Sequence, residues 1–211
     1  MNNEELRQQY NDIYKEKPDK WTSNGRDNDA WFMLDRILGK APKTLLDIGC
    51  GNGHTIKYFS DRWKTTRYTG LDISDEAIEI AKSIIPDVLY LCGEIEEVQI
   101  DCNYDVITIL GTAEHFPDIG KKMKYISQFL EPKGVLYLEV PNNLSYSENK
   151  EEGFRVSLGG NQKEWHLTKE SWNKILEEAG LVTYITRTYV DPFPIFIWIL
   201  QKSQLLENPG E

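Results

Sequence analysis

An apolar segment that runs into three alternating glycines limits the folds available to this chain more than any other feature. Residues 45–48 are LLDI, residues 49–53 are GCGNG, and a helix-compatible segment begins at His54. Glycine adopts positive φ angles readily and leaves the backbone bare, so a ligand can lie against it at the start of a helix. The segment therefore predicts a strand, a tight ligand-binding turn and a helix.

Strand-length apolar segments alternate with amphipathic segments over most of the chain. The expected strands are TLLDIG from Thr44, RYTGLD from Arg67, VLYLCG from Val88, YDVITIL from Tyr104 and GVLYLEV from Gly134; the expected helices are 54–62, 75–85, 119–130 and 168–179, with another near 29–38. This alternation predicts an α/β fold with a Rossmann-like doubly wound sheet, mostly parallel, with helices on both faces. Two β-prone segments, 181–189 and 193–201, lie only three residues apart and predict a C-terminal antiparallel hairpin.

The length of the chain indicates a single domain. Its 211 residues, 40% of them hydrophobic, are enough for one sheet covered by helices. We expect an N-terminal helical cap or lid at 1–42, a ligand-binding core at 43–140, an insertion on the substrate side at 141–166, and a C-terminal helix and hairpin at 167–211.

Composition argues against several classes of function. The formal net charge is −10 and the pI is near 4.9, whereas a nucleic-acid partner requires clustered Lys and Arg. The cysteines Cys50, Cys92 and Cys102 lack CxxC spacing, so we expect neither a disulfide framework nor a metal site.

We find no export signal and no membrane-spanning segment, and expect a soluble cytoplasmic protein with no membrane partner. The sequence leaves the oligomeric state open.

The glycine run also separates two classes of cofactor. A dinucleotide-binding GxGxxG motif needs Gly or Ala where this chain has His54. The run resembles motif I of the class I (Rossmann-like) S-adenosylmethionine-dependent methyltransferases, in which a D/ExGxGxG loop curves round the methionine part of the cofactor. The resemblance implies that S-adenosylmethionine, or its product S-adenosylhomocysteine, contacts the residues Asp47, Gly49, Cys50, Gly51 and Gly53. A Gly-rich turn after a strand also occurs in many other α/β proteins.

Five further segments resemble the same family, in the same order, between about Thr44 and Leu181. The last two are LEPKGVLYLEVPN from Leu130, which resembles the family's entry to the fifth strand, and WHLTKESWNKILEEAGL from Trp165, which resembles its C-terminal helix. Asp72 and Ile73 follow the second expected strand, where the family binds ribose; the alternative for Asp72 is a helix cap, although Ser74 or Asp75 is better placed for that. Glu94 and Ile95 match the adenine-binding position, where the alternative for Glu94 is a solvated loop carboxylate. The segment LGTAEHFPD from Leu110 resembles the family's stretch ending in EHxPD and adds Leu110 to the cofactor residues. Gly111 replaces a residue that is often acidic in that family.

Methyl transfer is an in-line displacement that needs no metal, and a hydroxyl acceptor additionally needs a base. Of the three histidines we expect His166 to be that base and His115 to be the second choice, the alternative for each being a hydrogen-bonded loop anchor. His54, at the start of a helix, is expected to face the cofactor or solvent.

The acceptor is expected to be a small polar metabolite or sugar-like compound, methylated on oxygen or else on nitrogen. The segment 141–165 is rich in Asn, Ser and Glu and follows the fifth expected strand, at the edge where open α/β sheets bind ligands. The residues expected to bind the acceptor are Tyr14, Trp21, Asn142 and Trp165. Trp31 is expected to pack a helix onto the sheet. A non-catalytic cofactor-binding protein remains an alternative, and an NAD-dependent oxidoreductase is a weaker one.

Overall fold

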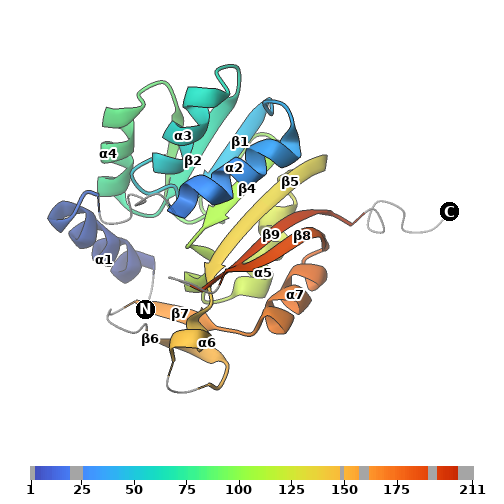
Figure 1. Ribbon diagram of the computed structural model, residues 1–211. Helices are drawn as coiled ribbons and strands as arrows, with labels where there is room; N and C mark the ends of the chain where they lie inside the picture. The colour runs from blue at the N-terminus through green and yellow to red at the C-terminus, as the bar shows by residue number, and fades with distance from the viewer. Residues whose placement is uncertain (1–2, 20–25, 148–149, 157–161, 190–193, 204–211) are drawn as a thin grey trace. The chain divides into compact units, whose positions relative to one another are not determined.

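The computed structural model describes residues 3–19, 26–147, 150–156, 162–189 and 194–203 (Figure 1). The chain forms two compact units, Met1–Ile107 and Thr108–Glu211, each of which is described by itself below. The prediction of a single domain is not tested by this division and stays a prediction.

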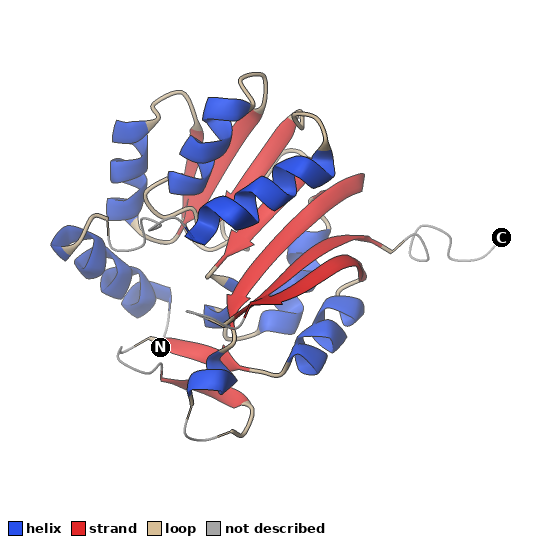
Figure 2. Ribbon diagram, viewed as in Figure 1, coloured by secondary structure: helices blue, strands red, loops and turns tan. Residues whose placement is uncertain are grey.

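Seven strands form one sheet in the order β3-β2-β1-β4-β5-β9-β8, and helices connect many of them along the chain (Figure 2). The strands are β1 (Thr44–Ile48), β2 (Arg67–Asp72), β3 (Leu89–Cys92), β4 (Tyr104–Leu110), β5 (Leu130–Pro141), β8 (Leu181–Tyr189) and β9 (Ile195–Lys202). The pairs β1–β2 and β2–β3 are parallel, whereas β9 pairs antiparallel with both β5 and β8. The predicted fold class, a mostly parallel Rossmann-like sheet with a C-terminal antiparallel hairpin, is confirmed. The residues expected between the two hairpin strands lie outside the described part of the chain.

The first unit carries the helices α1 (Asn3–Glu16), α2 (Arg26–Leu38), α3 (His54–Arg62) and α4 (Asp75–Ile84). The ranges of α3 and α4 agree with the sequence prediction to within one residue. The Trp31 ring of α2 is buried and lies 4.6 Å from the Tyr58 ring of α3, so Trp31 packs one helix on another. No helix in the described part of the chain has the length and apolar character needed to cross a membrane.

Helix α1 was not predicted, because contacts with distant residues, and not a local apolar stripe, hold it in place. The hydroxyl of Ser74 donates to Asn11 Oδ1 at 2.7 Å, and Lys15 forms an ion pair with Glu76 at 3.2 Å. Tyr14 is the one residue of α1 that is buried. A polar helix of this kind docks on the N-terminus of α4 without showing a continuous hydrophobic face in the sequence.

The second unit contains the helices α5 (Ile119–Ser127), α6 (Asn143–Tyr146) and α7 (Lys169–Glu178), and a short 3-10 turn, η1 (Ala113–His115). The segment expected to be an insertion folds into α6 and an antiparallel pair of strands, β6 (Gly153–Val156) and β7 (Lys163–His166). These strands were missed because four residues give too short an alternation to recognise.

Two element boundaries in the second unit differ from the prediction. Helix α5 ends at Ser127 instead of Leu130, and β5 begins at Leu130 instead of Gly134. Pro132, which lacks a backbone N–H, lies within the part of β5 that was not predicted. Because Pro132 lies in the exposed first part of β5, the missing donor leaves no buried group unpaired there.

The first testable prediction concerns the start of α7. The Thr168 hydroxyl accepts a hydrogen bond from the Ser171 N–H at 3.2 Å, which caps the helix. Thr168→Ala is expected to lower the free energy of unfolding by about 1 kcal/mol, since it leaves that N–H without its partner. Chemical denaturation measures the free energy of unfolding of the parent and the variant. The exposed Glu177→Ala on the same helix is the control and should change stability by less than about 0.5 kcal/mol. Equal stability of the two variants would contradict the role of Thr168.

Candidate functional site

The loop after β1 has the backbone that its glycines predicted. Gly49, Gly51 and Gly53 have φ angles of 74°, 51° and 81°, a region that disfavours side chains. The N–H groups of Gly49 and Cys50 donate to the Leu71 carbonyl at 2.7 and 3.0 Å, so the loop is held at the carboxyl end of β2. A side chain at position 51 would also collide with the hydroxyl of Tyr14. The loop is thus a bare backbone surface that tolerates little substitution.

Asp72 connects the glycine loop to the end of β2. Its Oδ2 accepts a hydrogen bond from the Gly51 N–H at 2.8 Å, and its Oδ1 accepts one from the Ser74 N–H at 2.9 Å. Burial raises the pKa of Asp72, and these backbone hydrogen bonds oppose the rise. The side-chain cap of α4 is Ser74, whose hydroxyl accepts from the Ala77 N–H, so Asp72 does not cap α4 with its side chain. Each carboxylate oxygen has a second lone pair with which to meet a ligand hydroxyl.

Glu94 and Ile95 lie just after β3, beside the end of β2. Asp72 pairs with Cys92 in the register of these two strands, and the N–H of Gly93 donates to the Asp72 carbonyl at 2.9 Å. Glu94 and Ile95 are 9% and 2% exposed, whereas the following two glutamates are exposed. The burial of Glu94 does not fit the alternative of a solvated loop carboxylate. Ile73, half-buried, lies between Asp72 and Ser74.

Tyr14 of α1 lies at the glycine loop in the first unit. It is 5% exposed, and its pKa is raised by burial first and by the charge of Asp72 second. Tyr14 was expected to bind the acceptor, but the structure places its hydroxyl against Gly51, among the expected cofactor residues. Trp21, which was expected to act with it, lies outside the described residues.

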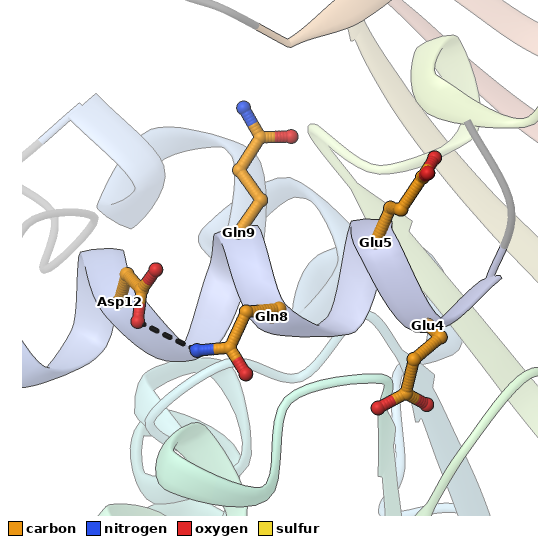
Figure 3. Close-up of a pocket in the computed structure, with 5 residues that line it drawn as sticks. All are labelled: Glu4, Glu5, Gln8, Gln9 and Asp12. Carbon is orange, nitrogen blue, oxygen red and sulfur yellow. Dashed lines mark hydrogen bonds between the residues drawn. The ribbon is translucent and has the colours of Figure 1, made fainter.

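A separate hollow lies along α1 and is lined by residues of that helix alone (Figure 3). Glu5 and Gln9 point to one side of the helix, and Gln8 donates a hydrogen bond to Asp12 at 2.7 Å. The hollow contains none of the expected cofactor residues, and we assign it no role. Glu4 completes its lining.

In the second unit, η1 and β7 bring two of the predicted residues together. His115 Nδ1 lies 2.9 Å from the Lys163 carbonyl oxygen, and Trp165 Nε1 donates to the Phe116 carbonyl at 2.8 Å. A carbonyl only accepts, so His115 carries its proton on Nδ1 and a lone pair on Nε2. Burial lowers the pKa of His115, although the hydrogen bond to the Lys163 carbonyl and the charge of Glu164 oppose this. The lowered pKa keeps the ring neutral at pH 7.

Glu114, beside His115, was not among the predicted site residues. It is 3% exposed, and its Oε1 lies 3.8 Å from His115 Nε2. Its Oε2 has no hydrogen-bond partner among the described residues. Burial raises the pKa of Glu114 to about 8, so this carboxyl is mostly protonated at neutral pH. Only its place next to a histidine in the EHxPD-like stretch could have marked it in the sequence.

His166 is the most buried histidine of the described residues, at 1% exposure. Its Nε2 lies 3.6 Å from Glu164 Oε1, and neither ring nitrogen forms a hydrogen bond within the described part of the chain. Burial and the charge of Arg155 lower its pKa, so His166 is neutral at pH 7. Glu164, whose own pKa burial raises, was missed by the sequence analysis. The alternation of Glu164 and His166 on one face of β7 becomes visible only once the strand is known.

The remaining predicted residues are dispersed over the two units. Asp47 is buried in β1 and Cys50 is buried in the loop, while Leu110 is half-buried at the end of β4. Asn142 is half-buried, and its N–H donates to the Pro194 carbonyl at 2.9 Å. The next residue, Asn143, donates its side-chain N–H to the Trp165 carbonyl at 3.1 Å.

Comparisons with known proteins agree on one family. A family model described as a methyltransferase domain matches residues 31–184. Malonyl-acyl-carrier-protein O-methyltransferase of Acetivibrio thermocellus is 33% identical over 118 residues, which are 55% of this chain and 41% of the relative. Trans-aconitate 2-methyltransferase of Escherichia coli is 27% identical over 174 residues, 77% of this chain and 66% of the relative. The chain thus matches less than two thirds of the length of either relative.

A solved structure shares the fold over nearly the whole chain. It is the 1,6-didemethyltoxoflavin-N1-methyltransferase of Burkholderia thailandensis, crystallised with 1,6-didemethyltoxoflavin and S-adenosylhomocysteine. The TM-score is 0.77 at 19% identity, and the superposition covers 94% of this chain and 88% of that one. At this identity the likeness concerns the fold alone.

The second prediction concerns Asp72. Asp72→Ala is expected to weaken the binding of S-adenosylhomocysteine by roughly 1 to 3 kcal/mol, since the ribose hydroxyls would lose charge-assisted acceptors. Asp72→Asn, which keeps one acceptor oxygen, should lose less. Calorimetry measures both, with the exposed Glu79→Ala on α4 as the control. An alanine variant that binds as tightly as the parent would show that Asp72 only organises the loop.

The third prediction follows from the buried Glu114. Its pKa is about 8 in the folded chain, above the ordinary value of 4.5 that applies when unfolded, so the folded state holds one more proton between these values. Stability from this group is therefore greatest below pH 4.5 and is lost as the pH rises through about 8, by up to about 5 kcal/mol. Denaturation at pH 5 and pH 8 should show a smaller loss in Glu114→Gln than in the parent. The exposed Glu177→Gln should retain the full loss, and the same loss in Glu114→Gln would contradict the assignment.

Proposed function

The chain belongs to the class I, Rossmann-like family of S-adenosylmethionine-dependent methyltransferases, and we propose that it transfers the methyl group of S-adenosylmethionine to a small polar or sugar-like acceptor. The observation that carries the proposal is the DxGxGxG loop, whose three glycines have positive φ and whose Gly51 N–H is held by Asp72. This loop would receive the methionine part, Asp72 the ribose, and Glu94 with Ile95 the adenine.

Oxygen is our proposed site of methylation, and nitrogen is the alternative. One relative is named as a malonyl-acyl-carrier-protein O-methyltransferase, which supports oxygen. The similar solved structure is named as an N1-methyltransferase. The polar insertion supports an acceptor rich in hydrogen-bonding groups, since a lipid pocket would be lined with apolar residues.

His115 is better suited than His166 to act as the base. The Lys163 carbonyl fixes the His115 tautomer, which leaves a lone pair on Nε2, and the His115 side chain is 16% exposed. The His166 side chain is only 2% exposed and would have to become accessible before it met an acceptor. We therefore reverse the order expected from the sequence and place His115 first.

The rate of the reaction depends mainly on how the two reactants are oriented. Methyl transfer is an in-line displacement at a carbon that the sulfonium already activates, and holding the reactants in line supplies ~7 to 11 kcal/mol of barrier lowering. A base that removes the acceptor proton adds roughly 10² to 10⁴-fold. The described residues supply a binding loop and a neutral imidazole for these two tasks.

The fourth prediction tests the choice of cofactor. S-adenosylmethionine and S-adenosylhomocysteine are expected to bind with dissociation constants on the order of micromolar, and nicotinamide dinucleotides far more weakly. Titration calorimetry on the parent chain checks this, because the loop offers His54 where a dinucleotide site needs a small residue. A preference for NAD would refute the proposal. Binding of S-adenosylmethionine without turnover of any compound in an acceptor screen would favour a non-catalytic binding protein.

The fifth prediction separates the two histidines. On an acceptor found by the screen, His115→Gln is expected to lower kcat by roughly 10²-fold or more, with cofactor affinity unchanged. His166→Gln should stay within about threefold of the parent. The opposite pattern would restore His166 as the base, and a small effect of both variants would exclude a histidine base of the usual strength.

A further inference from the structure

Glu114 and His115 place two proton-accepting atoms close together in a buried setting. Glu114 Oε1 and His115 Nε2 are 3.8 Å apart, which is longer than a hydrogen bond. Each atom can accept a proton when Glu114 is ionised, because the bond to Lys163 keeps the His115 proton on Nδ1. Glu114 Oε2 has no partner among the described residues although the side chain is 3% exposed. A buried carboxyl oxygen without a hydrogen bond is costly, which calls for an explanation beyond packing.

We propose that Glu114 and His115 form a proton-accepting pair, and that the methyl acceptor is therefore a hydroxyl or an amine that loses a proton on methylation, and not a carboxylate. The inference rests on the proposed function. In this pair His115 is the group that meets the acceptor, and Glu114 is a positioning residue that receives the proton from the imidazole.

The chemistry of a hydroxyl acceptor balances with this pair. The O–H bond breaks and its proton passes to His115 Nε2, a new O–C bond forms, and the S–C bond breaks with its electrons remaining on sulfur. The imidazolium Nε2–H then passes its proton to the ionised carboxylate of Glu114. The pair ends as neutral imidazole and neutral carboxyl, the form that burial favours. Loss of that proton to solvent restores the starting state.

A carboxylate acceptor would make no use of this arrangement. Methylation of a carboxylate by a sulfonium gives a neutral ester and releases no proton, so the pair has nothing to accept.

Burial raises the pKa of Glu114, and a hydrogen bond from its own backbone N–H opposes the rise. Arg155 of β6 pairs across the strands with Glu164 of β7 and acts on His166. Lys122 of α5 lies 5.3 Å from the Phe116 ring centre, and Glu139 of β5 is buried. Lys163 is exposed and offers its carbonyl to His115.

The pair can be tested without an acceptor by NMR titration of the intact chain between pH 5 and pH 9, with ¹⁵N-labelled histidine and ¹³C-labelled glutamate carboxyls. We expect one buried Glu carboxyl to titrate near pH 8 and the Nε2 resonance of His115 to shift over the same range. In Glu114→Gln both changes should vanish, whereas Glu164→Gln should retain them. A His115 resonance that is flat around pH 8 in the parent chain would overturn the pair, and so would a shift that persists in Glu114→Gln. The titration of the parent chain tests the pair even if a variant fails to fold.

The acceptor class has its own test. With S-adenosylmethionine present, trans-aconitate is the carboxylate probe, and S-adenosylhomocysteine formation is expected to stay at the level seen without an acceptor. Methyl ester formation on trans-aconitate would overturn the inference while leaving the proposed function intact. Failure to bind S-adenosylmethionine would instead defeat the proposed function, and the NMR titration would still report on the pair.

Discussion

The hydrogen bond from the Gly51 N–H to Asp72, 2.8 Å long, is the contact on which the first unit depends. It joins the loop after β1 to the end of β2, and the second oxygen of the same carboxylate fixes the backbone at Ser74, where α4 begins. Parallel strands place their carboxyl ends together, so one buried acid can organise both turns. The three glycines with positive φ lie in the loop that this carboxylate holds, and α1 contacts the hydroxyl of Ser74.

The second unit is organised around buried titratable side chains. Glu114, His115, Glu164 and His166 are all largely buried, and burial raises the pKa of both carboxyls and lowers that of both imidazoles. Groups kept in their neutral forms avoid the cost of burying charge, yet they reduce stability as the pH departs from the range in which they stay neutral. Such groups are typical of sites that move protons.

Sequence reasoning recovered the parts of the fold that local pattern determines. The bounds of α3, the cap at Ser74 and the hairpin strands follow from apolar periodicity, capping residues and spacing. Helix α1 was missed because it is held by distant partners such as Ser74, and strand β7 was missed because four residues give too short an alternation to recognise. The burial of Tyr14 and of Glu114 could not be predicted, since it depends on tertiary contacts that no local window contains. The role of each candidate site residue stays a prediction.

The central claim is that this chain moves a methyl group from S-adenosylmethionine to a small molecule. The most direct measurement is to incubate the purified chain with S-adenosylmethionine labelled with ¹³C at its methyl group and a small-molecule extract, and to follow the label by mass spectrometry. The account predicts labelled methyl on a low-mass hydroxyl or amine compound, together with an equal amount of S-adenosylhomocysteine, and less of both with Asp72→Ala at limiting cofactor. Binding of the cofactor with no label in any compound would contradict it.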